Sequence, residues 1–142
     1  MLSILVAVDG SKPSDRVVDQ VIEDLKQLKA PAEVHLLNVQ PPLVGVNVKL
    51  FIGKEDLTGY YQEQGLATLK GARERLAGAG VAHTHHIGVG DPAQVIAQYA
   101  EDKQCNRIYI GGRGLGSVKG MILGSVATKV IHLGKMPVVV VK

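Results

Sequence analysis

Short apolar runs alternate with amphipathic segments along this chain, and that alternation constrains its fold more than any other feature. The run at 2–8 (LSILVAV) is nearly all apolar and rich in β-branched residues, which is typical of a strand buried on both faces of a parallel sheet. It ends at a turn signal, 9–11 (DGS), and from Ser14 to Leu28 apolar residues recur at helical spacing. The N-terminal part therefore predicts a strand followed by an amphipathic helix.

The same alternation continues to the C-terminus. Helices are expected after Asp91-Pro92, which offers a cap and a first-turn proline, and over 57–77 and 125–133. Further strands are expected over 33–40, 81–89, 107–110 and 137–141, and a long loop over 43–56. Parallel strands need crossovers that are right-handed and helical. This order therefore predicts an open, doubly wound α/β fold with helices on both faces of a five-stranded parallel sheet.

Length and composition narrow the class of protein. A chain of 142 residues, 46% of them hydrophobic, supports one compact core, so a single domain over 1–142 is expected. No apolar run approaches the roughly 18 residues that span a bilayer, and no basic region or cleavage site precedes Asp9. We therefore expect a cytoplasmic protein without a membrane partner. Cys105 is the sole cysteine, which excludes an intrachain disulfide.

The charge pattern argues against a nucleic-acid partner. The formal net charge is +3, but the sixteen Lys and Arg residues are scattered along the chain instead of forming a block. Aromatic residues make up only 4% of the chain, so platforms on which bases could stack are scarce. The surplus of positive charge still favours a small anionic ligand.

Glycine is concentrated in one segment. Six of the seventeen glycines lie within 111–124 (GGRGLGSVKGMILG), between a predicted strand and a predicted helix that Ser125 could cap. Backbone N–H groups and the positive end of the helix dipole could converge there on a phosphate, and glycine would permit positive φ angles and close approach of the chain. The alternative is a surface loop without a ligand.

Two common phosphate motifs do not fit this segment. Residues 111–116 have the glycine spacing of a Walker A loop, but Ser117 and Val118 stand where a lysine and a hydroxyl residue are required. The dinucleotide fingerprint fails because the glycines follow the fourth strand with the wrong spacing and the second strand ends without an acidic residue.

The spacing does resemble the ATP-binding branch of the universal stress protein family. Gly111 and Gly114 are followed after nine residues by Gly124-Ser125, which matches the family pattern G-x-x-G-x9-G-[ST]. The strand ends VAVDGS and LLNVQ and the closing MPVVVV also match, so the resemblance covers essentially the whole chain. It implies the strand order 3-2-1-4-5, with a ligand at the switch point between strands one and four.

The resemblance also implies the site residues and the ligand. The ligand would be ATP, or ADP or AMP, with Mg²⁺. Asp9 and the backbone around Ala7, Val8 and Val39 would hold the adenine and the ribose. The phosphates and ribose would be surrounded by residues at the end of strand four and along the glycine segment: Ile110, Gly111, Arg113, Gly114, Gly124, Ser125 and Val126. Arg113 could pair with a phosphate or point to solvent.

The favoured function is regulatory nucleotide binding in a stress response, read by an unknown protein partner. A slow ATPase or phosphotransferase is the alternative, but neither a general base nor an activated nucleophile can be assigned, so no catalytic residue is predicted. A nucleotide-free interaction module is a third reading. A homodimer is expected through the apolar edge strand Val138 to Val141, as the family also implies.

Three histidines near residue 85 do not predict a metal site. His83 and His85 would share one face of a strand, and His86 follows them, but no cysteine or carboxylate in the segment completes a ligand set. His132 lies near a helix C-terminus, where a cation is favourable in any case.

Overall fold

The computed structural model describes residues 1–29, 31–43, 54–114 and 123–142. All strand pairs are parallel, and the sheet has the order β3-β2-β1-β4-β5, which confirms the predicted fold. The strands are β1 (Leu2–Ala7), β2 (Ala32–Gln40), β3 (His83–Val89), β4 (Arg107–Gly111) and β5 (Val138–Val141). The helices are α1 (Lys12–Gln27), α3 (Lys54–Gly78), α4 (Pro92–Asp102) and α5 (Ser125–Leu133).

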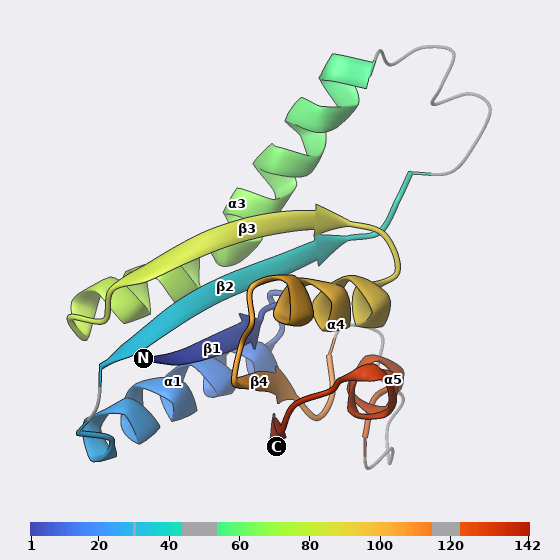
Figure 1. Cartoon of the computed structure of the whole chain (residues 1–142). Helices are drawn as coiled ribbons and strands as arrows, with labels where there is room; N and C mark the ends of the chain where they lie inside the picture. The colour runs from blue at the N-terminus through green and yellow to red at the C-terminus, as the bar shows by residue number, and fades with distance from the viewer. Residues whose placement is uncertain (30, 44–53, 115–122) are drawn as a thin grey trace.

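Two helices cover each face of the sheet. In Figure 1, α4 and α5 lie in front of the sheet and α1 and α3 lie behind it. Successive side chains of β1 point to opposite faces, so Ile4 and Val6 pack with α1 and α3 while Leu5 and Ala7 pack with α4 and α5. Burial of each large aliphatic side chain contributes about 1.5–3 kcal/mol, and this explains why the central strand is almost entirely apolar.

The helix starts follow local capping chemistry. Ser11 caps α1, because its Oγ accepts a hydrogen bond from the Ser14 backbone N–H at 3.3 Å, and the helix begins at Lys12, two residues earlier than the periodicity indicated. Asp91 caps α4 as predicted, and Pro92 occupies the first turn. The Asp91 carboxylate accepts from the Gln94 N–H at 3.1 Å.

The predicted loop 43–56 falls largely outside the described residues, and its last three residues belong to α3.

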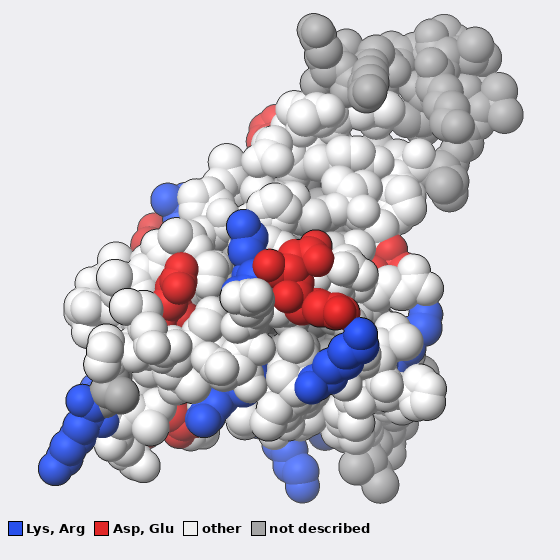
Figure 2. Space-filling view, in the orientation of Figure 1, with Lys and Arg blue, Asp and Glu red and all other residues white. Residues whose placement is uncertain are grey.

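Within the described residues, no helix combines the length and apolarity needed to cross a bilayer. Acidic and basic side chains lie side by side on the face shown in Figure 2.

Candidate functional site

A cavity of about 350 Å³ opens at the carboxyl ends of the central strands. It lies on the face of the sheet covered by α4 and α5, where the strand order reverses between β1 and β4. Open α/β sheets place their ligands at such a switch point. Its volume is within the roughly 300–1,000 Å³ typical of small-molecule sites.

The structure brings every predicted site residue to this cavity. The two parts of the glycine segment, the strand ends and the acidic turn all contribute to its wall, through Ala7, Val8, Asp9, Val39, Ile110, Gly111, Arg113, Gly114, Gly124, Ser125 and Val126. Residues 115–122, the middle of the glycine segment, lie outside the described residues.

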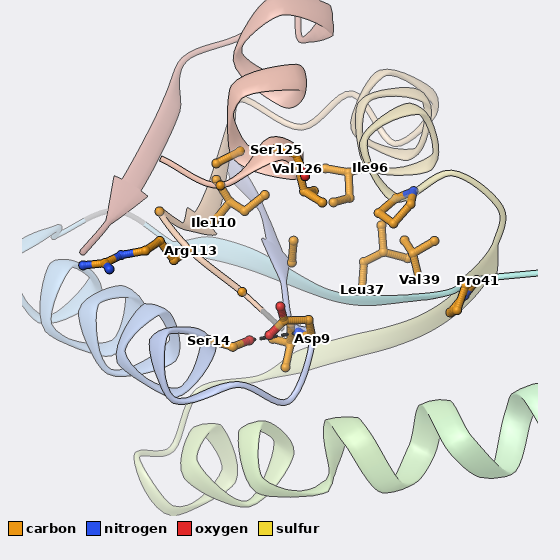
Figure 3. A pocket seen from close by; sticks show the side chains of 18 residues that line it. Asp9, Ser14, Leu37, Val39, Pro41, Ile96, Ile110, Arg113, Ser125 and Val126 are labelled. Carbon is orange, nitrogen blue, oxygen red and sulfur yellow. Dashed lines mark hydrogen bonds between the residues drawn. The ribbon is translucent and has the colours of Figure 1, made fainter. Parts of the chain in front are cut away.

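One part of the cavity is apolar. Figure 3 shows Ile96 of α4 beside Val126 of α5, with Leu37 and Val39 of β2 on one side of them and Ile110 of β4 on the other. These side chains are contributed by four different elements and offer no hydrogen-bonding groups. Such a surface suits a flat, largely apolar ring system better than a charged group.

The other part of the cavity is polar and begins at the turn after β1. The Asp9 backbone N–H donates to Ser14 Oγ at 3.0 Å, and the Ser11 N–H donates to Asp9 Oδ1 at 2.9 Å. Figure 3 shows Asp9 beside Ser14, and both residues line the cavity. The turn thus fixes a carboxylate at the cavity entrance.

The described first part of the glycine segment lies against this carboxylate. Gly112 donates its N–H to the Val141 carbonyl at 2.8 Å, and the Gly124 N–H donates to the Gly112 carbonyl at 2.5 Å, so the two ends of the segment are joined. A Cβ atom on Gly114 would collide with Asp9 Oδ2. Close approach of the backbone therefore explains the glycine at 114.

The expectation of positive φ angles in this segment was wrong for its described part. Among the described glycines, positive φ occurs at Gly10, Gly80 and Gly90, and Gly124 has φ −71°. Space therefore explains the glycine at 114, whereas any residue could adopt the backbone angles of Gly124.

The expectation that Ser125 caps the last helix was also wrong. Ser125 is the first helical residue, Gly124 is the N-cap, and no side chain caps this end. The first N–H groups of a helix have no partner within it, and here the first three residues of α5, Ser125, Val126 and Ala127, line the cavity. The N-terminus of α5 can therefore offer uncapped N–H groups to an anion.

The Arg113 side chain points away from the cavity, and its pairing with a phosphate stays a prediction. Its side chain is exposed, and Figure 3 shows the guanidinium directed away from the other labelled residues. It reaches the cavity through its place in the segment and does not direct its charge into it.

A salt bridge holds the two helices that cover the cavity. Lys129 of α5 lies 3.2 Å from the Asp91 carboxylate at the start of α4. The hydrogen bond from the Gln94 N–H, followed by Lys129, lowers the pKa of Asp91 below its ordinary value. Asp91 thus stays ionised and keeps both its cap and its partner. The pair is largely exposed, so its own contribution to stability is small.

Some lining residues were not predicted, namely Ser14, Leu37, Pro41, Pro92, Ile96, Gly112 and Ala127. Two of them carried a signal, since Leu37 shares a strand face with Val39 and Gly112 adjoins Gly111. Pro92 and Ile96 reach the cavity because α4 packs across the sheet, which no local motif encodes.

The histidines lie away from the cavity. His83, His85 and His86 belong to the edge strand β3, and His132 lies in the last turn of α5. In the parts of the chain that the structure describes, no group of three His, Cys, Asp or Glu side chains is arranged to hold a metal ion.

Known proteins are similar to this chain in both sequence and fold. The universal stress protein YxiE of Bacillus subtilis is 32% identical over 148 residues, which cover 98% of this chain and 97% of that protein. The solved structure of protein MJ0577 of Methanocaldococcus jannaschii has a TM-score of 0.84 at 28% identity and covers 99% of this chain and 95% of its own.

A structure of a family member from Arabidopsis thaliana, described with AMP bound, has a TM-score of 0.71 at 22% identity and covers 100% of this chain and 92% of its own, which shows a shared fold. The model of the Universal stress protein family matches residues 1–142. This match and the similarity to YxiE, together with the strand order and the glycine spacing, show that the chain belongs to the universal stress protein family.

Proposed function

We propose that this chain is a regulatory protein that binds an adenine nucleotide, ATP or else ADP or AMP, in the cavity at the switch point. The observation that carries the proposal is the convergence of an apolar wall, a fixed carboxylate and a helix N-terminus on one cavity of nucleotide-compatible size. Separate parts of an adenine nucleotide match these three features: a flat base, ribose hydroxyls and phosphates.

The base fits the apolar part and the phosphates fit the glycine segment. Leu37, Val39 and Ile96 would contact the adenine, while the ribose hydroxyls would donate to the Asp9 carboxylate. The phosphates would accept from the N–H groups of Gly114 and of the first turn of α5. The AMP complex of the Arabidopsis protein shows that this fold can hold such a ligand in that protein.

Mg²⁺ would be held mainly by the phosphates and water. Among the described residues that line the cavity, Asp9 carries the only carboxylate. Mg²⁺ keeps several waters and commonly binds through one or two carboxylates and the substrate phosphates, so this arrangement is compatible with a bound Mg²⁺–nucleotide complex.

Regulation by binding fits the site better than catalysis. The described lining residues include no histidine, cysteine or lysine, and their only carboxylate, Asp9, is assigned here to the ribose. We therefore expect ATP turnover far below the roughly 10 per second of a typical enzyme. Multiple-turnover hydrolysis at that rate, lost when Gly114 is replaced, would overturn the regulatory function and favour an enzyme.

The proposal includes a homodimer through β5. This strand lies at an edge of the sheet and pairs only with β4 in the described structure, and its valines are half-buried. An apolar edge of this kind is suited to pairing with a second copy.

The experiment that tests the binding proposal begins with the purified protein. Denaturation should release an adenine nucleotide that mass spectrometry identifies, and calorimetric titration of the emptied protein should give saturable binding of ATP, ADP or AMP. If no nucleotide is released and none of the added nucleotides binds, nucleotide binding is refuted and the nucleotide-free interaction module is favoured.

A further inference from the structure

A buried amide lies directly beneath the proposed ribose contact. Asn38 of β2 is only 3% exposed, and its Nδ2 donates to the Val8 carbonyl oxygen at 2.8 Å. Its Oδ1 accepts from Gln40 Nε2 at 2.6 Å. The side chain is therefore held at both ends within a short chain of hydrogen bonds that runs from Gln40 through Asn38 to Val8.

This chain acts at the point where the regular pairing of β1 and β2 stops. The register runs as far as Ala7 opposite Leu37, and the Val8 N–H still donates to the Leu37 carbonyl at 2.9 Å. Beyond that bond, the Asn38 side-chain Nδ2, in place of a backbone N–H, donates to the Val8 carbonyl. Asp9 follows immediately, so the position of Val8 determines where the Asp9 backbone leaves the sheet.

Asn38 cannot itself contact a ligand in the cavity. Leu37 and Val39 line the cavity, and neighbouring residues of a strand point to opposite faces. Asn38 therefore lies on the side of α1 and α3, with Val8 between it and the cavity. Any effect of Asn38 on a ligand must be transmitted through the β1 end.

We propose that Asn38, supported by Gln40, is a positioning residue that orients Asp9 toward the ribose hydroxyls and so gives the site its preference for a ribonucleotide. The inference rests on the proposed function. A carboxylate discriminates between ligands only if it is held in place, because a mobile one can turn to water and loses little when the hydroxyls are missing. Ser14 and Ser11 fix Asp9 from the turn, and Asn38 holds the preceding residue, Val8, from the sheet.

The test measures the dissociation constants of ATP and of 2′,3′-dideoxyadenosine triphosphate by calorimetry. In the wild type we expect ATP to bind about tenfold more tightly, since the analogue leaves the carboxylate without its hydroxyl donors. Asp9→Ala should bring this ratio close to one. Asn38→Leu, which keeps the approximate size and removes the amide, should also reduce the ratio to within about threefold of one.

The ratio separates positioning from a general structural role. If Asn38 only stabilised the sheet, Asn38→Leu would lower the melting temperature and weaken both ligands by the same factor, which leaves the ratio at its wild-type value. That result would overturn the inference. In the Asp9→Ala background, Asn38→Leu should change the ratio no further.

Two more variants keep the test decisive. Gln40→Met removes the outer donor at a half-buried position, so it carries the same comparison if Asn38→Leu does not fold, and an unchanged ratio in this variant would then refute the inference. Gln98→Met is the matched control, because Gln98 Nε2 donates to Asp102 Oδ1 on the surface of α4, and its ratio should equal that of the wild type. Equal wild-type affinities for the two ligands would overturn this inference alone, whereas failure of ATP, ADP and AMP all to bind would overturn the proposed function.

Discussion

At the scale of single residues, the site depends on where a Cβ atom can be placed. A Cβ on Gly114 would collide with the Asp9 carboxylate, whereas one on Gly124 would lie 3.4 Å from the Gly112 carbonyl oxygen, an ordinary contact. Two glycines of the same motif therefore tolerate substitution differently. The collision at Gly114 is with the end of a side chain, so Asp9 can turn away and the fold survives while the carboxylate is displaced.

Gly124 should accept alanine and reject valine. The alanine methyl fits the available space, so ATP affinity should stay within about threefold of the wild type. Valine adds two methyl groups toward the Arg113 backbone, whose Cα would already lie 3.5 Å from a Cβ on residue 124, and should weaken ATP binding by at least about tenfold. Calorimetry on both variants checks this, and loss of binding in Gly124→Ala would show that more than space is required here.

Ser125→Ala should leave the stability of the ligand-free protein unchanged. Because Ser125 makes no capping hydrogen bond, the free energy of unfolding of the variant in urea should differ from that of the wild type by less than about 0.5 kcal/mol. ATP affinity should fall by about 0.5–1.5 kcal/mol if the hydroxyl donates to a phosphate. A loss of about 1–2 kcal/mol in the absence of ligand would restore a capping role.

At the scale of elements, sequence patterns predicted the features that depend on neighbouring residues, namely strand positions and a helix cap. The strands and the cap at Asp91 followed from apolar runs and from Asp-Pro. Helical spacing alone would place Leu66 of α3 on the buried face with Leu69 and Leu76, but Leu66 is 37% exposed and the other two are fully buried. Gly65 permits close packing of α3 on β3, because a Cβ there would lie 2.6 Å from the Ile87 side chain.

The residues of the candidate site also fall into those that the sequence predicts and those that depend on tertiary packing. Its predicted residues lie at strand ends or within one spaced motif, so the parallel topology alone brings them to one edge of the sheet. Ile96 and Pro92 depend on the angle at which α4 crosses the sheet, and Asn38 depends on which strand lies beside β2. Those are tertiary relations, which a single sequence does not display.

The edge strand β3 should make stability depend on pH. Burial, and then the nearby charges of Arg73, His83 and His86, lower the pKa of His85 below its ordinary 6.5. The unfolded chain therefore binds this proton at a higher pH than the folded one, so the contribution of His85 to stability is constant above pH 6.5 and declines as the pH falls below it toward the folded pKa. His85 is exposed, so the effect is small.

Melting temperatures between about pH 5 and 8 test this for the wild type and His85→Gln. The variant should lose part of the decline below about pH 6.5 and match the wild type above it. Identical pH profiles would mean that His85 titrates alike in the folded and unfolded chain.

At the scale of the whole molecule, the two edges of the sheet should behave differently. We expect β5 to mediate a homodimer, so lysine at Val139 and Val141 should shift the sedimenting species from dimer to monomer through charge repulsion and lost apolar contact. Val89→Lys on the opposite edge strand, at a 43% exposed position, is the matched control and should remain dimeric. A dimer that survives the β5 substitutions would place the interface elsewhere.

The most direct test of nucleotide binding at this cavity is a calorimetric titration of ATP into Gly114→Ala. Gly71→Ala is its control, because among the described atoms nothing lies within 4 Å of a Cβ at that exposed helical position. Both variants should melt near the wild-type temperature without ligand, and Gly71→Ala should bind ATP normally. Gly114→Ala should bind at least about tenfold more weakly, because its methyl group displaces the carboxylate. Wild-type affinity in a folded Gly114→Ala protein would contradict the assignment of the glycine segment and Asp9 as the nucleotide site.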